Sequence, residues 1–580
     1  MKKKILFIII SIIFISTKIF AVSKSCSELV LNDKWKFSTG DNLSWANPKF
    51  NDSNWRDISS RFNWENQGVP EYDGYGWYRK QIILPESLIT SIKKNGGIIV
   101  KYNNADDVDE LYFNGHKIGI TGSFPPNYIS KYNTKRKYTI PIEYIIFDRP
   151  NTIAIRVYDG GGDGGLITQN TIIRAKNAVD AIQLKYSLPV ENGAFYSSES
   201  QYIKIKLKNT SDKAIWINTI LKISTDNYIA IDSINFPVKL RGNSTLEATI
   251  PFKLTNPGFY RFKLFLQRNN EISDPEKFNI GYEPEKIISI RDAKPDFESF
   301  WTQTLSELNK VEPKFKMKLI PEQSTGMRNI YQVEMMSFGN IKIEGFYACP
   351  KKEGKYPAIA SFMGYGSGPY YPLTDSNIDF AEIIISVRGQ GIQKANSAYG
   401  DWITWGLESK ENYYYRGAFM DLVRAVDFLV SRPEVDANKI VAEGGSQGGA
   451  FTIVAAALDH RIKAAAPSIP FLSDYRDYFQ IAPWPRSSFE TYLKLHPNDS
   501  WDRIYDLMSY FDIKNFSSWI LCPIFMAVGL QDEVCPNHIN FAAYNLIQSK
   551  KRYIIYPDQG HGTPSAWSDL KREFFLKNIE

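Results

Sequence analysis

The stretch IVAEGGSQGGAFTIVAAAL, residues 440–458, decides the fold that we predict for the C-terminal half of this 580-residue chain. It begins with apolar residues typical of a buried strand, passes through a glycine-rich turn and ends in a run typical of a helix. Glycines two residues before and after Ser446 fit a sharp turn, because a Cβ there would clash with neighbouring backbone. A strand, a tight turn holding a serine and a helix form a nucleophile elbow. We therefore predict that Ser446 is a nucleophile at the N-terminus of a helix, whose dipole favours a developing negative charge.

The same alternation of strands and helices continues on both sides of this stretch. Short apolar runs separated by helical periodicity predict a mostly parallel sheet that is covered by helices on both faces. The pattern changes near Pro284, so we assign residues 286–580 to an α/β-hydrolase domain. The predicted strands are 358–362, 382–387, 440–442, 462–466, 524–528 and 552–556, and the predicted helices are 416–431, 447–459, 536–549 and 565–577.

A serine hydroxyl is a weak nucleophile at neutral pH and needs a general base within hydrogen-bonding reach. The chain has five histidines, and His561 follows a predicted strand at the carboxyl end of the sheet, where catalytic loops lie. His116 lies in an N-terminal β region, His460 at a helix-to-strand turn, His496 in an excursion from the sheet and His538 at the start of a helix. We therefore predict that His561 is the base and exclude the other four histidines.

The predicted acid of a catalytic triad is Asp532, in the loop after strand 524–528. We expect its neighbour Glu533 to be solvated. The order Ser446, Asp532, His561 is the chain order of α/β-hydrolases.

The oxyanion that forms during acyl transfer needs two N–H donors. One is expected from the backbone amide of Gln447, directly after the nucleophile. The other is expected from Tyr365, in the loop after strand 358–362. This chemistry requires no metal or organic cofactor, and we predict none.

Residues 290–580 contain several further motifs: Arg388-Gly389-Gln390-Gly391, Tyr415-Arg416-Gly417, Arg432-Pro433-Glu434-Val435-Asp436, the glycine-rich turn around Ser446, and Gly529-Leu530 with Asp532. By these motifs, this segment resembles carbohydrate esterase family 7, the group of acetyl xylan esterases and cephalosporin C deacetylases. The resemblance implies that the substrate is an O-acetyl ester on xylose units or short xylo-oligosaccharides. It also implies that Arg388, Gly389 and Gln390 brace the active-site loops.

Two departures from that family leave the substrate range open. Met363 stands where the family usually has histidine, and Gly562 follows His561 where the family favours glutamate. The additional β modules of this chain also depart from the compact form of the family. We therefore do not infer the ring-like oligomer of the family for this chain, and whether the chain forms a homo-oligomer stays open.

Two β-rich segments precede the α/β domain. Residues 27–175 contain a stretch from Trp55 to Arg79 that resembles the galactose-binding-like jelly-roll modules of bacterial glycosidases and esterases. Residues 180–283 alternate apolar and polar residues between turns, which predicts an immunoglobulin-like sandwich acting as a spacer. In the jelly-roll we expect most tryptophans to fill the core, with a sugar-stacking platform as the alternative. They are Trp35, Trp45, Trp55, Trp64 and Trp77.

Residues 1–21 have the features of a secretory signal peptide: a charged start, an apolar run over 5–16 and Ala21 for cleavage. That run is too short to span a bilayer, and we predict no membrane span. A lipid anchor at Cys26 is less favoured, because Lys24 does not fit the small and aliphatic residues that precede a lipid-anchored cysteine. We expect a secreted or periplasmic protein.

Charge and cysteine content exclude several classes of function. Four basic residues lie within the first 21 positions, which hold no acid, and no concentrated basic face remains to indicate nucleic acid binding. Four cysteines without a Cys/His cluster indicate neither a disulfide framework nor a zinc site. We favour buried thiols for Cys522 and Cys535, but whether they pair stays open.

These observations predict a secreted serine esterase that removes acetyl groups from xylan or xylo-oligosaccharides. One alternative is a prolyl-oligopeptidase-like serine peptidase, which shares the fold and the elbow but usually has tyrosine at the position of Gln447. The other is a carbohydrate-binding protein with an inactive hydrolase domain, against which the intact triad argues. The predicted partner is an acetylated carbohydrate.

Overall fold

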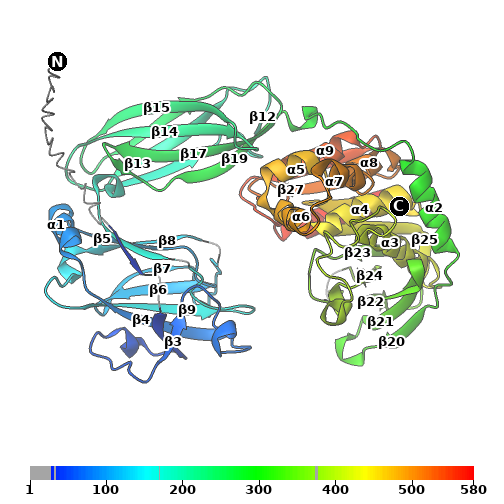
Figure 1. Ribbon diagram of the computed structural model, residues 1–580, viewed down its shortest axis with the longest axis horizontal. Helices are drawn as coiled ribbons and strands as arrows, with labels where there is room; N and C mark the ends of the chain where they lie inside the picture. The colour runs from blue at the N-terminus through cyan, green and yellow to red at the C-terminus, as the bar shows by residue number, and fades with distance from the viewer. Residues whose placement is uncertain (1–27, 32–33, 133, 169, 373–376) are drawn as a thin grey trace, which may run out of the picture. The chain divides into compact units, whose positions relative to one another are not determined.

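The computed structural model describes residues 28–31, 34–132, 134–168, 170–372 and 377–580 (Figure 1). The predicted signal peptide and Cys26 lie outside these residues. The chain divides into two compact units, Met1–Ala181 and Ile182–Glu580. Among the described residues, no helix combines the length and the apolar character needed to cross a membrane.

The first unit is a sandwich of two antiparallel sheets around one hydrophobic cluster. Asn114 and Gly115, both with positive φ, join two of its strands in a hairpin. A helix that the sequence did not predict, α1 (Glu86–Asn95), adds Leu88 and Ile92 to the core. The first sheet contains β1 (Glu28–Leu31), β10 (Thr171–Ala175), β5 (Gly97–Tyr102) and β8 (Arg136–Pro141), and the second contains β3 (Arg56–Ser59), β2 (Lys34–Thr39), β4 (Gly74–Ile82), β9 (Asn151–Asp159), β6 (Val108–Phe113) and β7 (His116–Thr121).

The tryptophans of this unit are mainly core residues. Trp35, Trp64 and Trp77 are fully buried. Trp45 and Trp55 are partly buried and pack edge-to-face, with ring centroids 5.1 Å apart. The three buried rings therefore cannot take part in a sugar-stacking platform.

The second unit begins with a sandwich of two further sheets. Apolar residues alternate with polar ones along the strands, and Tyr186 of one sheet stacks on Phe278 of the other at 4.0 Å. One sheet contains β11 (Ile182–Ser187), β13 (Tyr202–Asn209) and β16 (Thr245–Pro251). The other contains β12 (Ala194–Phe195), β19 (Glu276–Tyr282), β17 (Gly258–Arg268), β14 (Ile215–Thr225) and β15 (Ala230–Leu240), with β18 (Glu271–Ile272) beside β17.

A nine-stranded mixed sheet forms the centre of the second unit. The six predicted parallel strands are present, and three antiparallel strands that the sequence did not predict extend one edge. The antiparallel strands are β20 (Lys316–Leu319), β21 (Arg328–Ser337) and β22 (Ile341–Pro350). The parallel strands follow in the order β24 (Ala381–Ser386), β23 (Tyr356–Phe362), β25 (Val435–Gly445), β26 (Ile462–Ser468), β27 (Ile524–Gly529) and β28 (Lys551–Tyr556).

Helices cover both faces of this sheet, as predicted. Successive strand residues belong to different clusters: Ala358 and Ala360 pack on one face, whereas Ile359 packs on the other. The first face is covered by α3 (Tyr414–Val430), α4 (Gln447–Leu458) and α9 (Asn537–Leu546), and the second by α10 (Ala566–Ile579). Further helices are α2 (Phe297–Asn309) and, between β26 and β27, α5 (Tyr475–Ile481), α6 (Pro483–Leu495), α7 (Trp501–Met508) and α8 (Ile513–Phe516).

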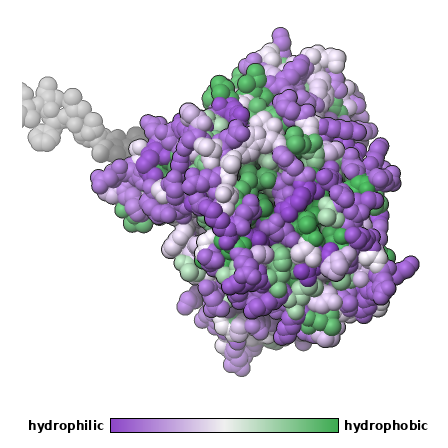
Figure 2. Space-filling view, turned by 90° about the vertical axis from the view of Figure 1, so that its right-hand side faces the viewer, coloured by the Kyte–Doolittle hydropathy of each residue, from purple (hydrophilic) through white to green (hydrophobic). Residues whose placement is uncertain are grey.

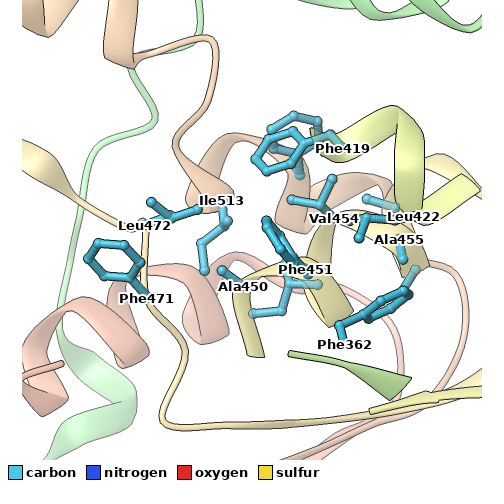
Figure 3. Packing of buried hydrophobic residues seen from close by; sticks show 14 of the residues in the cluster. Phe362, Phe419, Leu422, Ala450, Phe451, Val454, Ala455, Phe471, Leu472 and Ile513 are labelled. Atoms are coloured by element: carbon cyan, nitrogen blue, oxygen red, sulfur yellow. The ribbon is translucent and has the colours of Figure 1, made fainter. Parts of the chain in front are cut away.

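Helix α4 is buried almost all round, which fixes the serine that precedes it. Figure 3 shows Phe451 and Val454 of α4 among Phe362, Phe419 and Ile513 from surrounding elements. A helix that is apolar on every side belongs in a core. On the surface seen in Figure 2, by contrast, hydrophobic residues form separate patches among hydrophilic ones.

The sandwich of the second unit packs directly on the loop that carries Asp532. Phe259 of β17 contacts Phe541 of α9, with ring centroids 5.5 Å apart. The backbone N–H of Asn279 donates to Gln531 Oε1 at 2.7 Å, and Asn279 Nδ2 donates to the Leu530 carbonyl at 3.1 Å. The segment predicted as a spacer therefore also supports the loop of the predicted catalytic acid.

An ion cluster joins the sandwich to the α/β domain. His538 of α9 lies 3.2 Å from Asp226 of the sandwich, 3.6 Å from Asp474 and 3.3 Å from Asp477. Lys514, 2.8 Å from Asp474, is the other cation of the cluster. Burial alone would lower the pKa of His538, but the three carboxylates raise it well above 6.5.

Replacing His538 with glutamine is expected to lower the free energy of unfolding by about 1.5–3 kcal/mol at pH 6, the range for hydrogen bonds to charged groups. Because the folded pKa is raised, this stabilisation is complete below 6.5 and is lost as the pH rises through the folded pKa. Thermal unfolding between pH 6 and 10 measures it, with the exposed His460→Gln as the control. An effect of His538→Gln that is equal at all these pH values would contradict the ion cluster as its cause.

Candidate active site

The turn between β25 and α4 has the geometry of a nucleophile elbow. Ser446 has φ 60° and ψ −119° and lies directly before the first residue of α4. A Cβ on Gly448 would lie 2.0 Å from the Phe362 carbonyl oxygen, and one on Gly444 would lie 2.5 Å from Gly448 backbone atoms. The glycines are therefore needed where the sequence predicted them.

The structure brings the three predicted triad residues together. His561 Nε2 lies 3.0 Å from Ser446 Oγ, and His561 Nδ1 lies 2.9 Å from Asp532 Oδ2. Each residue follows the carboxyl end of its own parallel strand, β25, β27 or β28. Asp532 is buried, whereas the His561 side chain is 30% exposed, so the imidazole is accessible from solvent.

The carboxylate of Asp532 is held by its own loop. Its Oδ1 accepts hydrogen bonds from the backbone N–H groups of Val534 and Cys535, both at 2.8 Å, which leaves Oδ2 toward His561. Asn537 Nδ2 donates to the Gly529 carbonyl at 3.0 Å and fixes the start of the loop. Glu533 is exposed, as predicted.

Cys535 was not predicted near the nucleophile. Its Sγ lies 4.0 Å from Ser446 Oγ. Burial and the nearby Asp532 raise the pKa of this thiol well above 9.0, so it is neutral and gives the serine an apolar neighbour. Cys522 and Cys535 are both buried free thiols in the structure.

The two backbone amides predicted to bind the oxyanion lie in segments next to the elbow and have no protein acceptor within the described part of the chain. Gln447 is the first residue of α4, so its N–H has no acceptor within the helix. A Cβ on Gly364, beside Tyr365, would lie 3.8 Å from the Gly445 carbonyl oxygen, which places the Tyr365 loop next to the elbow. Over the described residues, neither the Gln447 nor the Tyr365 backbone N–H donates to a protein acceptor.

Gln390 links the segments that carry these two amides. Its Oε1 accepts from the Gly366 N–H at 3.2 Å and from Gln447 Nε2 at 3.1 Å. Its Nε2 donates to the Tyr414 hydroxyl at 2.9 Å. Every polar atom of this buried amide therefore has a partner, in agreement with the expected bracing role.

Arg388 supports the same region without approaching the triad. Its guanidinium pairs with the buried carboxylate of Asp421, with Nη2 2.7 Å from Oδ1 and Nε 3.0 Å from Oδ2. Gly389 has φ +72°, and a Cβ there would lie 2.4 Å from the Tyr399 ring. The three residues Arg388, Gly389 and Gln390 thus fix the loop after β24.

Replacing Gln390 with alanine is expected to lower kcat about tenfold or more, because the two amides would no longer be fixed relative to each other and one oxyanion donor is worth about 10²–10³ in kcat. KM is expected to change little. Steady-state kinetics on a chromogenic acetate measure both constants, with the exposed Gln480→Ala as the control. A change confined to KM would contradict the bracing of the oxyanion amides.

The other histidines are engaged elsewhere in the structure. His116 stacks on Tyr144, and His496 stacks on Tyr492, each at 4.0 Å between ring centroids. His460 is exposed, and His538 belongs to the ion cluster. Their exclusion as the base therefore agrees with where they lie.

Sequence reasoning missed an aromatic wall beside the oxyanion loop. The Tyr365 ring packs edge-to-face against Trp402 and Trp484, both at 5.3 Å, and Phe471 stacks on Trp484 at 5.2 Å. Trp484 comes from α6, in the excursion between β26 and β27. The aromatic residues of this excursion were the available signal in the sequence. Nothing in the sequence, however, indicated that they pack beside the Tyr365 loop.

Among the described residues, two clusters of aspartate or histidine side chains have ligand atoms close enough for a metal ion. One is Asp474, Asp477 and His538, in which the imidazole of His538 lies within ion-pair distance of both carboxylates and Lys514 lies 2.8 Å from Asp474. The other is Asp106, Asp107 and Asp159 in the first unit. Neither cluster includes a triad residue, and the absence of a cofactor stays a prediction.

Comparison with known proteins identifies relatives of the α/β domain. The family model described as acetyl xylan esterase (AXE1) matches residues 283–579, just over half of the chain. The acetyl esterase Axe7A of Xylanibacter ruminicola is 26% identical over 341 residues, which cover 56% of this chain and 76% of that protein. Acetyl xylan esterase 1 from Thermoanaerobacterium sp. JW/SL YS485 is 30% identical, with 51% of this chain and 98% of that one covered at a TM-score of 0.48.

A further relative lies outside the esterases. The β-galactosidase BoGH2A of Bacteroides ovatus is 27% identical over 138 residues, which are 22% of this chain but 15% of that protein.

The segment matched by the esterase family contains the elbow, the acid and the base described above. This chain therefore belongs to the acetyl xylan esterase (AXE1) family and is a carboxylic ester hydrolase.

Proposed function

We propose that this protein removes O-acetyl groups from xylan or xylo-oligosaccharides through an acyl-enzyme formed on Ser446. The observation that carries the proposal is the hydrogen-bonded chain from Ser446 Oγ to His561 to Asp532. It lies within a segment that belongs to an acetyl esterase family. The substrate class is supported by the acetyl esterase relatives.

In the first half of the reaction, His561 Nε2 takes the proton of Ser446 Oγ while the oxygen attacks the acetyl carbonyl carbon. Asp532 keeps the Nδ1 proton in place and stabilises the imidazolium. The backbone N–H groups of Gln447 and Tyr365 donate to the oxyanion. The tetrahedral intermediate then expels the sugar oxygen, which takes the proton from His561.

The second half repeats these roles with water as the nucleophile. His561 removes a proton from water, which attacks the acyl carbon, and collapse of the second intermediate releases acetate and restores Ser446. The exposed edge of the imidazole gives water access.

The proposal includes secretion to the periplasm or the medium, supported by the charged start, apolar run and Ala21 of residues 1–21. Expression in a bacterial host followed by fractionation and N-terminal mass determination tests it. We expect a mature chain that begins after Ala21 outside the cytoplasm, and an intact cytoplasmic chain would contradict this part.

The direct test of the activity is acetate release by the purified protein from acetylated xylo-oligosaccharides. We expect release of acetate from these substrates and no cleavage of proline-containing peptides. Peptide cleavage without acetate release would favour the peptidase instead. Sugar binding without either reaction would favour an inactive hydrolase domain.

A further inference from the structure

A row of three lysines crosses the outer face of the larger sheet of the second-unit sandwich. Lys263 of β17 lies directly opposite Lys277 of β19 on one side and Lys222 of β14 on the other. Residues that are directly opposite in antiparallel strands share a face, and like charges in this position destabilise a sheet. All three side chains are exposed. The sheet therefore carries concentrated positive charge at a cost in its own stability.

These charges are not neutralised by neighbouring acids. Within the described part of the chain, Lys263 and Lys277 have no ion pair or hydrogen bond, and Lys222 lies over the Phe265 ring at 5.7 Å. The acids at the edges of the row are Glu533, 3.8 Å from Arg261, and Asp232. The row is thus free to bind an external anion.

The row opens onto the loop of the catalytic acid. A hollow of about 380 Å³ is lined by Lys263 and Lys277 on one side and by Gln531 and Glu533 on the other. The latter two residues flank Asp532 in the sequence. A second hollow, of about 550 Å³, continues along the same face past Lys222 and Lys263.

The shape of the row indicates the kind of anion. Three lysines on adjacent strands extend over about 10 Å, since strands lie about 4.8 Å apart. That length exceeds one carboxylate and fits several acidic groups on an extended chain. Ammonium groups bind as hydrated point charges without a fixed geometry, which fits sugar carboxylates in varied positions.

We propose that this lysine row, Lys222, Lys263 and Lys277, binds the carboxylates of uronic acid residues and so selects acidic acetylated polysaccharides as substrates. The inference rests on the proposed deacetylase function and names a substrate class within it. A chain with an acetyl group at Ser446 would place neighbouring sugar units along the hollow beside Asp532. The carboxylates of those units would then meet the row.

The test compares kcat/KM for an acetylated xylo-oligosaccharide that carries glucuronic acid with kcat/KM for its carboxyl-reduced, neutral counterpart. At low salt, the protein is expected to favour the acidic substrate about tenfold. The preference should fall toward unity as NaCl rises to about 0.5 M, because salt screens exposed charges. In the triple variant Lys222→Gln, Lys263→Gln, Lys277→Gln the ratio should be close to one.

The matched control replaces three exposed lysines of the other sheet, Lys185, Lys204 and Lys208, with glutamine and should keep the preference. An equal preference in the wild-type protein and the lysine-row variant would overturn the inference. Calorimetry with the Ser446→Ala protein and a deacetylated acidic oligosaccharide measures binding without turnover. If acetate is not released but the acidic oligosaccharide still binds in a way that depends on the lysine row, the proposed function alone is refuted. If acetate is released without a preference for the acidic substrate, the inference about the lysine row alone is refuted.

Discussion

Replacing Ser446 with alanine is expected to lower acetate release by about 10⁴- to 10⁶-fold, the range over which loss of a triad nucleophile acts. The Cys535 thiol, 4.0 Å away, is not expected to replace the serine, because it is buried and its pKa is raised, so it stays protonated. The variant should fold, since the serine side chain makes few contacts and the turn depends on the flanking glycines. Turnover of a chromogenic acetate and circular dichroism measure the two expectations.

The exposed Ser487→Ala in α6 is the matched control and should keep full activity. Covalent labelling with a fluorophosphonate adds a second readout, with one label expected per wild-type chain and none on the Ser446 variant. If the Ser446 variant retained even a tenth of the activity, another nucleophile would have to carry the reaction.

The parallel part of the fold was accessible from the sequence because its central strands are buried on both faces. Such strands form nearly continuous apolar runs, as at Ile524–Gly529 and, apart from Glu382, in the strand Ala381–Ser386. The antiparallel strand β21 escaped prediction for the opposite reason. In β21, buried positions alternate with partly exposed ones, so no continuous run marks the strand.

The triad was predictable because the fold fixes the order of its three residues along the chain and places each of them at the carboxyl edge of the parallel strands. The supporting contacts were not predictable, since they join segments with no sequence relation. Gln390 and Gln447 face each other across 57 positions, and Asn279 contacts Gln531 across 252. The lysine row likewise exists because of strand register: its residues are scattered over 222–277 among other charges, and the composition gave no sign of a basic face.

The second large effect expected is that of Asp532→Asn, which should lower kcat about 10⁴-fold with little change in KM. The reason lies in the loop around the carboxylate. Oδ1 accepts from the backbone N–H groups of Val534 and Cys535, so an asparagine would place its carbonyl oxygen there. Its NH₂ group would then face His561 Nδ1.

A donor at that position forces His561 to accept at Nδ1 and to carry its proton on Nε2. The imidazole would then donate to Ser446 Oγ instead of accepting its proton, and the base would be lost although every heavy atom stays in place. Steady-state kinetics and a crystal structure of the variant test both parts, with the exposed Asp502→Asn in α7 as the control. A loss of less than tenfold with the geometry retained would show that Asp532 does not set the tautomer, and the carboxylate that orients the base would have to be sought elsewhere.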